Sequence, residues 1–89
     1  MSEKIWSDDA WEDYLFWQQN DKKIVKRINL LVKDIERNGC VVGIGKPEPL
    51  TGDLMGEYSR RIDEKNRLVY HMENGRIFIA HCRGHYDDK

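Results

Sequence analysis

The chain has little cysteine, little proline and no long apolar run. Two cysteines and two prolines occur among 89 residues, and Cys40 and Cys82 lack the paired spacing of a metal site. No segment approaches the length of a membrane-spanning helix, and the N-terminal residues lack the apolar core of a signal peptide. These absences argue against a disulfide scaffold and a membrane protein. We therefore expect a cytoplasmic protein with reduced thiols and no cofactor.

The chain also lacks a net charge of either sign. The sequence has fifteen Lys and Arg residues and sixteen Asp and Glu residues, for a formal net charge of −1. This net charge does not indicate a nucleic-acid partner. Residues 60–86 are locally basic, with six Lys and Arg against three acids. This excess is compatible with a phosphate-binding surface and equally with a solvated sheet face. The length predicts one domain, residues 1–89, with a modest core.

A short strand and a helix are predicted at the start of the chain. Residues 4–6 can form the strand, and Ser7 is a typical N-cap followed by two acids that suit the positive end of a helix dipole. The helix then runs to about Gln19. Its core-facing residues, at helical spacing, are expected to be Ala10, Trp11, Tyr14, Leu15 and Trp17.

A second helix follows at once, with Asn20 or Asp21 as its N-cap. The pair Asn38-Gly39 is a typical left-handed terminator. The short joint between the helices predicts an antiparallel helical hairpin. One apolar face of this second helix is formed by Ile24, Ile28, Leu31 and Ile35.

Residues 67–86 predict a β-hairpin that carries most of the chemistry of the chain. Two apolar runs flank Asn74-Gly75, which is the strongest short-range hairpin signal. The loop can hold two residues, Asn74-Gly75, or three, Glu73-Asn74-Gly75, with Gly75 left-handed and a bulge. The choice matters because a shift of one residue in register moves every side chain to the other face.

We favour the three-residue loop, because it separates one apolar face from one cationic face, as an antiparallel sheet usually does. The open face then collects Arg67, Val69, His71, Ile79, His81, Arg83 and His85. The apolar face collects Leu68, Tyr70, Met72, Phe78, Ala80 and Cys82.

Residues 39–56 hold five glycines and both prolines and predict a loop. Pro47 and Pro49 flank Glu48, and each proline restricts the residue before it to extended conformations. Glu48 is therefore expected on a stiff, extended strut. Stiffness suits a catalytic carboxylate, whereas a solvated loop glutamate is the commoner case.

Residues 57–63 alternate in polarity and predict another strand, with Tyr58 and Ile62 toward the helices and Ser59 and Arg61 toward solvent. The fold class is therefore α+β, with two N-terminal helices packed on one face of a small antiparallel β-sheet. A carboxylate, an imidazole and several guanidiniums, without a metal-ligand set, suit metal-free cleavage of RNA. We expect them on the open face as Arg61, Arg67, Arg83 and His85, with Glu48 arriving from the loop.

Six motifs occur in order along nearly the whole chain: IWSDDAWEDYLFW, KIVKRINLLVKDIER, GKPEPL, GEYSRRI, NRLVYH and CRGHY. With them the sequence resembles the YoeB (Txe) branch of the RelE superfamily of toxin ribonucleases. The resemblance implies a RelE-like, microbial-ribonuclease-like fold and a toxin that cleaves mRNA in the ribosomal A site, on the 30S rRNA, and so inhibits translation. It also implies a YefM-type antitoxin as partner and leaves a homodimer open.

Carried over by motif, the family's site residues fall on Glu48 within KPEPL, Arg67 within RLVY, and His85-Tyr86. The resemblance implies that Glu48 is the general base and His85 the general acid, although a glutamate beside arginines can play either part. It implies that Arg67 steadies the scissile phosphate and that Tyr86 stacks on or orients a base. Further RNA or phosphate contacts are expected from Arg61, Arg83 and Lys46.

Three features depart from the family's pattern. Thr51 stands where a lysine is frequent, Gly84 stands where an aromatic is common, and residues 87–89 follow the usual terminal tyrosine. We expect these departures to affect rate and affinity more than the type of reaction.

The alternative function belongs to a different class. Some proteins of this superfamily bind DNA gyrase, and others serve only as antitoxin-paired modules without ribonuclease chemistry. A binding module has no need of an acid–base pair, so the presence of both Glu48 and His85 favours the ribonuclease.

Overall fold

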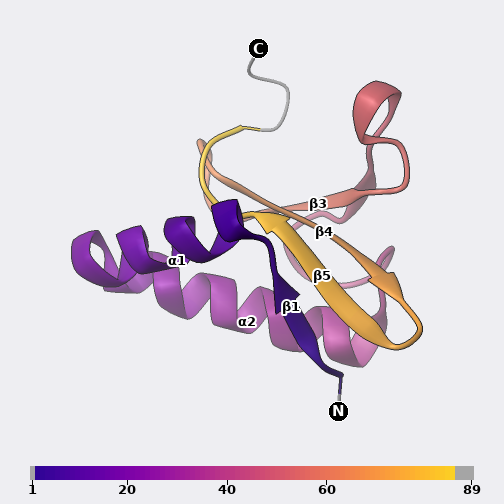
Figure 1. The fold of residues 1–89 in the computed structure, drawn as a ribbon, viewed down its shortest axis with the longest axis horizontal. Coiled ribbons are helices and arrows are strands. Elements are labelled where there is room, and N and C mark those ends of the chain that lie inside the picture. The colour runs from indigo at the N-terminus through magenta and orange to yellow at the C-terminus, as the bar shows by residue number, and fades with distance from the viewer. Residues whose placement is uncertain (1, 86–89) are drawn as a thin grey trace.

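The structure, a computed structural model, describes residues 2–85 as two helices against one face of a five-stranded sheet (Figure 1). This is the α+β arrangement that the sequence predicts. None of the helices in residues 2–85 is long and apolar enough to cross a membrane. The elements in chain order are β1 (Lys4–Trp6), α1 (Asp8–Asn20), α2 (Lys22–Asn38), β2 (Glu48–Pro49), a 3₁₀ turn (Gly52–Leu54), β3 (Tyr58–Arg61), β4 (Arg67–Glu73) and β5 (Arg76–His81).

Helix α1 begins where the sequence predicts. The side chain of Ser7 accepts a hydrogen bond from Ala10 N at 3.0 Å, and its hydroxyl donates to the carbonyl of Ala80 at 2.6 Å. The cap therefore also ties the helix to β5. Ala10 is buried and Tyr14 and Trp17 pack against the core, but Trp11 is 45% exposed, so its assignment to the core was wrong.

Helix α2 is capped by Asp21, whose carboxylate accepts from the backbone N–H groups of Lys23 and Ile24. It ends at Gly39, with φ of 88°, and the N–H of Gly39 donates to the carbonyl of Ile35. Both ends agree with the prediction. The predicted apolar face is buried, with Val32 beside it: Ile24, Ile28, Leu31 and Ile35.

The strand order across the sheet is β1-β5-β4-β3-β2. Strand β1 pairs with β5 in parallel, and the other three pairs of neighbours are antiparallel. The sheet is therefore mixed rather than wholly antiparallel. Parallel neighbours need a long crossover connection, and here the two helices and the rest of the sheet lie between β1 and β5 in the chain (Figure 1).

The hairpin between β4 and β5 has a two-residue turn, so the favoured three-residue loop was wrong. Asn74 and Gly75 have φ of 53° and 77°, the pair of positive values that a type I′ turn requires, and Glu73 pairs with Arg76. The positive φ predicted for Gly75 is confirmed. His71 pairs with Phe78, so Phe78 lies on the open face, against the prediction.

A β-bulge at Ala80 restores the expected faces further along β5. Tyr70 pairs with Ile79 and Val69 pairs with His81, which leaves Ala80 without a partner on β4. Before the bulge, the predicted faces of Phe78 and Ile79 are exchanged, and Ile79 is buried in the core. After it, His81 stands on the open face with Val69, and Cys82 is fully buried, as predicted.

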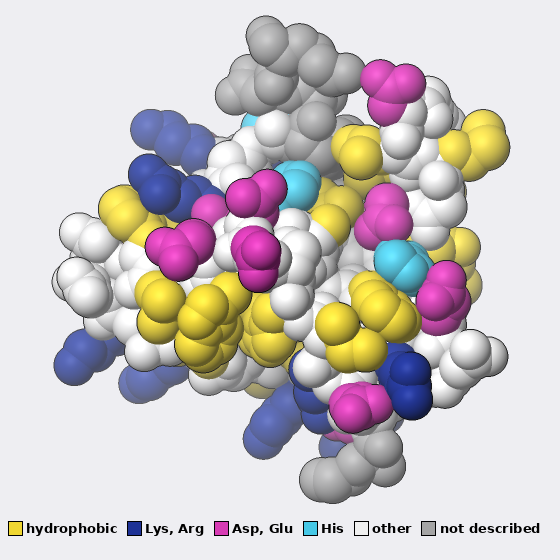
Figure 2. Space-filling model, in the orientation of Figure 1, with side chains coloured by type: hydrophobic (Ala, Val, Ile, Leu, Met, Phe, Trp, Pro, Cys, Tyr) yellow, Lys and Arg dark blue, Asp and Glu magenta, His cyan; other side chains and the backbone are white. Residues whose placement is uncertain are grey.

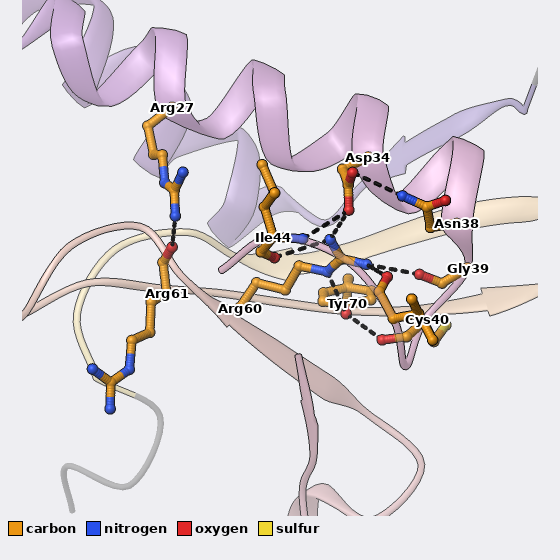
Figure 3. Close-up of polar contacts among 10 residues, drawn as sticks. Arg27, Asp34, Asn38, Gly39, Cys40, Ile44, Arg60, Arg61 and Tyr70 are labelled. Atoms are coloured by element: carbon orange, nitrogen blue, oxygen red, sulfur yellow. Dashed lines mark hydrogen bonds and ion pairs between the residues drawn. The ribbon is translucent and has the colours of Figure 1, made fainter. Parts of the chain in front are cut away.

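A charged residue, Arg60, lies between α2, the loop that follows it and Tyr70 of β4 (Figure 3). It is 0% exposed, and its guanidinium forms an ion pair with Asp34 of α2 and donates to the hydroxyl of Tyr70 at 2.9 Å. It also donates to backbone carbonyls of the loop after α2, those of Gly39, Val42 and Ile44. Arg60 thus holds this loop against β3. A buried guanidinium is tolerated here because its donors are hydrogen-bonded.

Candidate active site

The open face, the side of the sheet away from the helices, carries most of the predicted site. Cross-strand partners project to the same face, and the register aligns one row across four strands, here called the glutamate row: Glu48, Ser59, Val69 and His81. A second row, the arginine row, pairs Arg61 with Arg67. Two residues of strand separate the rows, or about 7 Å. Glu48, Arg61 and Arg67 therefore lie on one face, as the sequence predicts.

Glu48 is held at the edge of the sheet by backbone pairing with β3. It is exposed and extended, as expected, and the N–H of Leu50 donates to the carbonyl of Glu57 at 2.9 Å, which continues the pairing. Lys46 departs from the expectation for a residue before proline, because its φ is 52°. Lys46 is exposed two positions before Glu48. The loop thus turns sharply at Lys46 and then presents Glu48 on a short, fixed strand.

Arg67 is more enclosed than a simple surface cation, with 8% of its surface exposed. Its Nη1 donates to the carbonyls of Asp63, Glu64 and Asn66 in the turn between β3 and β4, at 2.7, 3.3 and 3.2 Å. These bonds fix the plane of the guanidinium at the mouth of the site. A rigid, planar donor of this kind suits the equatorial oxygens of a phosphoryl group.

The segment that carries His85 is fastened to the start of β4. The N–H of Arg67 donates to the carbonyl of Gly84 at 3.0 Å, and the N–H of Gly84 donates to Oδ1 of Asn66 at 2.8 Å. Half-buried His85 follows directly, so the fold brings it next to Arg67. Asn66 is a positioning residue that the sequence reasoning missed, and the signal for it was the Asp63–Asn66 turn. Tyr86, the fourth predicted catalytic residue, lies outside the described residues, as do residues 87–89.

One predicted cation does not join the open face. The guanidinium of Arg83 lies over the ring of Phe16 on α1, 3.6 Å from its centroid, so its predicted place beside Arg67 was wrong. Arg60 is buried in the core. The cluster of cations counted along residues 60–86 is therefore not one patch. Among the predicted phosphate contacts, the open face keeps Arg61 and Arg67.

A third row, which the sequence reasoning did not identify as a group, lies on the other side of the glutamate row. We call it the aromatic row: Glu57, His71, Phe78 and Ile5. Nδ1 of His71 lies 2.8 Å from Oε2 of Glu57, and the rings of His71 and Phe78 stack with centroids 4.9 Å apart and planes 2° apart. The signal that could have found it was the two-residue turn, which places His71 opposite Phe78.

The donor set of the open face favours acid–base chemistry on a phosphodiester. Within residues 2–85, no three His, Cys, Asp or Glu side chains gather as ligands for a metal ion. A carboxylate at the sheet edge, a fixed guanidinium and an imidazole held beside it can remove a proton, stabilise charge on phosphorus and return a proton. These are the parts that cleavage of RNA through its own 2′-hydroxyl requires.

The fold is that of the RelE-like toxins, which is the class that the helices, the sheet and the open-faced site define. The structure superimposes with a TM-score of 0.91 on a chain of the YoeB-YefM complex from Staphylococcus aureus, at 51% identity over 97% of this chain and 99% of that one. A YoeB dimer from the same organism gives a TM-score of 0.90 at 53% identity, over 96% and 98%. The model of the YoeB-like toxin of bacterial type II toxin-antitoxin systems matches residues 6–86.

The chain belongs to this family of YoeB-like toxins. It is 54% identical over 82 residues to Toxin YoeB of Escherichia coli (strain K12), which covers 92% of this chain and 96% of that protein. The resemblance stated from the motifs is thereby confirmed, as is the RelE-like fold. The protein is a toxin of a type II toxin-antitoxin system.

Proposed function

We propose that this toxin is a ribosome-dependent endoribonuclease that cleaves mRNA in the A site, on the 30S rRNA, and so inhibits translation. The observation that carries the proposal is that Glu48 and Arg67 share one open sheet face and that the segment carrying His85 is fastened to Arg67. The high identity to YoeB toxins supports it.

The proposed reaction needs no metal ion. The carboxylate of Glu48 takes the proton of a ribose 2′-hydroxyl, and the 2′-oxygen attacks the adjacent phosphorus. Arg67 and Arg61 stabilise the charge that develops on the phosphorane oxygens. His85 gives its proton to the leaving 5′-oxygen, and the P–O5′ bond breaks. The products are a 2′,3′-cyclic phosphate and a free 5′-hydroxyl, and the second proton transfer balances the first.

The remaining predicted contacts have secondary parts in this scheme. Tyr86 stacks on or orients a base, and Lys46 approaches the strand beside Glu48. The ribosome supplies the alignment of the mRNA, because a few side chains on a small open sheet cannot both hold and orient a flexible strand. Free RNA is therefore a poor substrate.

The partners we propose are a YefM-type antitoxin, which covers the site, and a second copy of the toxin. The solved relatives are a YoeB-YefM complex and a YoeB dimer, both from S. aureus. With mRNA on translating ribosomes as the substrate, the toxin acts in the cytoplasm.

The test is a translation extract to which the purified toxin is added, followed by mapping of the new mRNA 5′ ends. We expect cuts confined to codons in the A site and new ends that carry a 5′-hydroxyl group. For the metal test, ribosome complexes are formed first, stabilised by polyamines and washed to remove free Mg²⁺. Adding EDTA to these complexes should not reduce the cutting. Loss of cutting that Mg²⁺ alone restores to the toxin would reject the metal-free mechanism. Growth arrest with intact mRNA would favour a gyrase-directed or non-catalytic module instead.

A further inference from the structure

A cavity of about 210 Å³ lies on the open face beside the proposed catalytic rows. Its wall includes all four members of the aromatic row, and the bulge of β5 and the N-cap of α1 close the other side. The lining residues are Ile5, Ser7, Glu57, His71, Phe78, Ile79 and Ala80. Figure 2 shows this face of the molecule, with an imidazole between acidic side chains at the border of a hydrophobic patch. Nothing in the proposed cleavage chemistry uses this cavity.

The cavity holds an acceptor that the protein does not use. One carboxylate oxygen of Glu57, Oε2, faces Nδ1 of His71 at 2.8 Å. The other, Oε1, is buried and has no hydrogen-bond partner among residues 2–85. A buried acceptor without a partner is costly, and a ligand that brings an N–H group would satisfy it.

The rest of the lining favours a flat, largely apolar ligand. The stacked rings of His71 and Phe78 lie beside Ile5, and a ring system can pack against them. A phosphate is disfavoured, because Glu57 lines the cavity and Oε2 of Glu73 lies 4.0 Å from Nε2 of His71. A planar ring that carries an amino group matches both the apolar wall and the unused oxygen.

The distance between the cavity and the proposed catalytic residues indicates which part of the RNA can reach it. Along the strands, Glu57 lies two residues from Ser59, or about 7 Å, and His71 lies four residues from Arg67, or about 13 Å. Across the sheet, Phe78 on β5 lies three strands from Glu48 on β2, or about 14 Å. A strand whose scissile phosphate lies between Glu48 and Arg67 would bring a base over this cavity one or two nucleotides further along.

We propose that the cavity is a nucleobase subsite that accepts an amino-bearing base of the bound RNA (adenine, cytosine or guanine), one or two nucleotides from the cleaved bond, and discriminates against uracil. This inference rests on the proposed function for its substrate. Glu57 accepts a hydrogen bond from the exocyclic amino group, and Phe78 and His71 contact the ring. Uracil flanks its single ring N–H with two carbonyl oxygens, which the Glu57 carboxylate repels.

The test is an NMR titration of the full-length protein with tetranucleotides that are 2′-O-methylated throughout and cannot be cleaved. One base at a time is varied among A, C, G and U. We expect shifts of the backbone amides of Ser7, Ile79 and Ala80, and at one position a dissociation constant about tenfold weaker for uracil than for the amino-bearing bases. Shifts confined to other surfaces, or equal affinity for all four bases at every position, would overturn the subsite.

Matched variants separate recognition from general charge. Glu57→Gln keeps the size and shape of the side chain but lacks the carboxylate charge, and we expect it to reduce the discrimination against uracil to less than about twofold. Glu73→Gln removes a neighbouring acid that does not line the cavity, and it should keep the discrimination. Phe78→Leu keeps an apolar wall and should weaken binding of all bases together. An equal effect of Glu57→Gln and Glu73→Gln would refute the assignment.

The two proposals fail in different ways. Shifts at the cavity with base discrimination, in a protein that leaves ribosome-bound mRNA uncut, would refute the proposed cleavage and keep the subsite. Cleavage of ribosome-bound mRNA by a protein whose cavity amides do not respond to any tetranucleotide would refute the subsite and keep the proposed function.

Discussion

The backbone N–H of Arg67 donates to the carbonyl of Gly84 at 3.0 Å. This bond joins the first residue of β4 to the segment that carries His85, so two of the proposed catalytic side chains are placed by one backbone contact. The position of His85 relative to Arg67 therefore depends on the main chain rather than on a contact between two flexible side chains. The predictions below treat the two residues as parts of one rigid unit.

Arg67→Ala should lower the rate of the chemical step by about a hundredfold or more, because a fixed donor aimed at developing charge acts mainly in the transition state. Arg67→Lys should not restore the rate, since an ammonium group lacks the planar fork. Single-turnover cleavage on ribosome-bound mRNA measures both. Arg76→Ala is the matched control, because Arg76 is exposed beside the hairpin turn and pairs with Glu3. An equal loss in this control would place the effect outside the site.

Glu48→Gln and His85→Ala should each lower the single-turnover rate by about a hundred- to ten-thousandfold, because each removes one proton transfer. Antitoxin binding should persist in both variants. Glu64→Gln, in the exposed turn between β3 and β4, serves as the control. Wild-type rates in Glu48→Gln, His85→Ala and Arg67→Ala together would show that the site assignment is wrong even though the family is right.

Arg60→Met should destabilise the fold by about 3–5 kcal/mol, because it removes one partner of a buried ion pair and leaves three loop carbonyls without their donor. Urea denaturation gives the free energy of unfolding. The control is Arg61→Met, one residue along, whose side chain is exposed; its effect should stay within about 0.5 kcal/mol. Similar losses in the two variants would contradict the structural role of Arg60.

The ion pair also predicts an acid limb of stability. The hydrogen bond from Arg60 holds the pKa of Asp34 below its ordinary value. A carboxyl group with a lowered pKa contributes its stabilisation in full above the unfolded value of about 3.9, and loses it as the pH falls through the folded value. The stability difference between the wild type and Asp34→Asn, measured in urea, should therefore be constant from pH 7 to pH 5 and shrink below about pH 4. A difference that grows on acidification would have the wrong sign.

The two thiols should react very differently. Burial raises the pKa of Cys82 to about 12, and this residue is 0% exposed, whereas Cys40 is partly exposed. Native protein should therefore give one equivalent of reaction with a thiol reagent at pH 8, and the second only as fast as the protein unfolds. Cys40→Ser should abolish the fast phase. A fast phase that survives in Cys40→Ser would show that Cys82 is accessible.

The helices and the site face could be predicted because their signals are local. Ser7, Asp21 and Gly39 mark helix ends through backbone hydrogen bonds that depend on neighbouring residues alone. The motifs around Glu48 and Arg67 likewise led to the correct family and to the correct sheet face. The catalytic roles themselves stay predictions.

The errors arose where long-range packing decides. Alternation along residues 57–63 places Arg60 and Arg61 on opposite faces, but only the approach of Asp34 and of the loop after α2 shows that Arg60 is fully buried and hydrogen-bonded there. Arg83 is drawn from the open face by Phe16, which is distant in the chain. The prediction of the hairpin faces was wrong for a related reason. The extra, bulged residue is Ala80, whose carbonyl accepts from Ser7 at the N-cap of α1, and it does not lie in the turn.

The extra residue at Ala80 makes chain length a determinant of the site. A strand alternates sides with every residue, so removing Ala80 would turn everything after it half a revolution about the strand axis. Cys82 would leave the core, where its carbonyl accepts from Trp17 Nε1 and its N–H donates to Asp13, and the segment that carries His85 would lose its present placement beside Arg67. The interval from the hairpin turn to His85 therefore cannot be shortened by one residue.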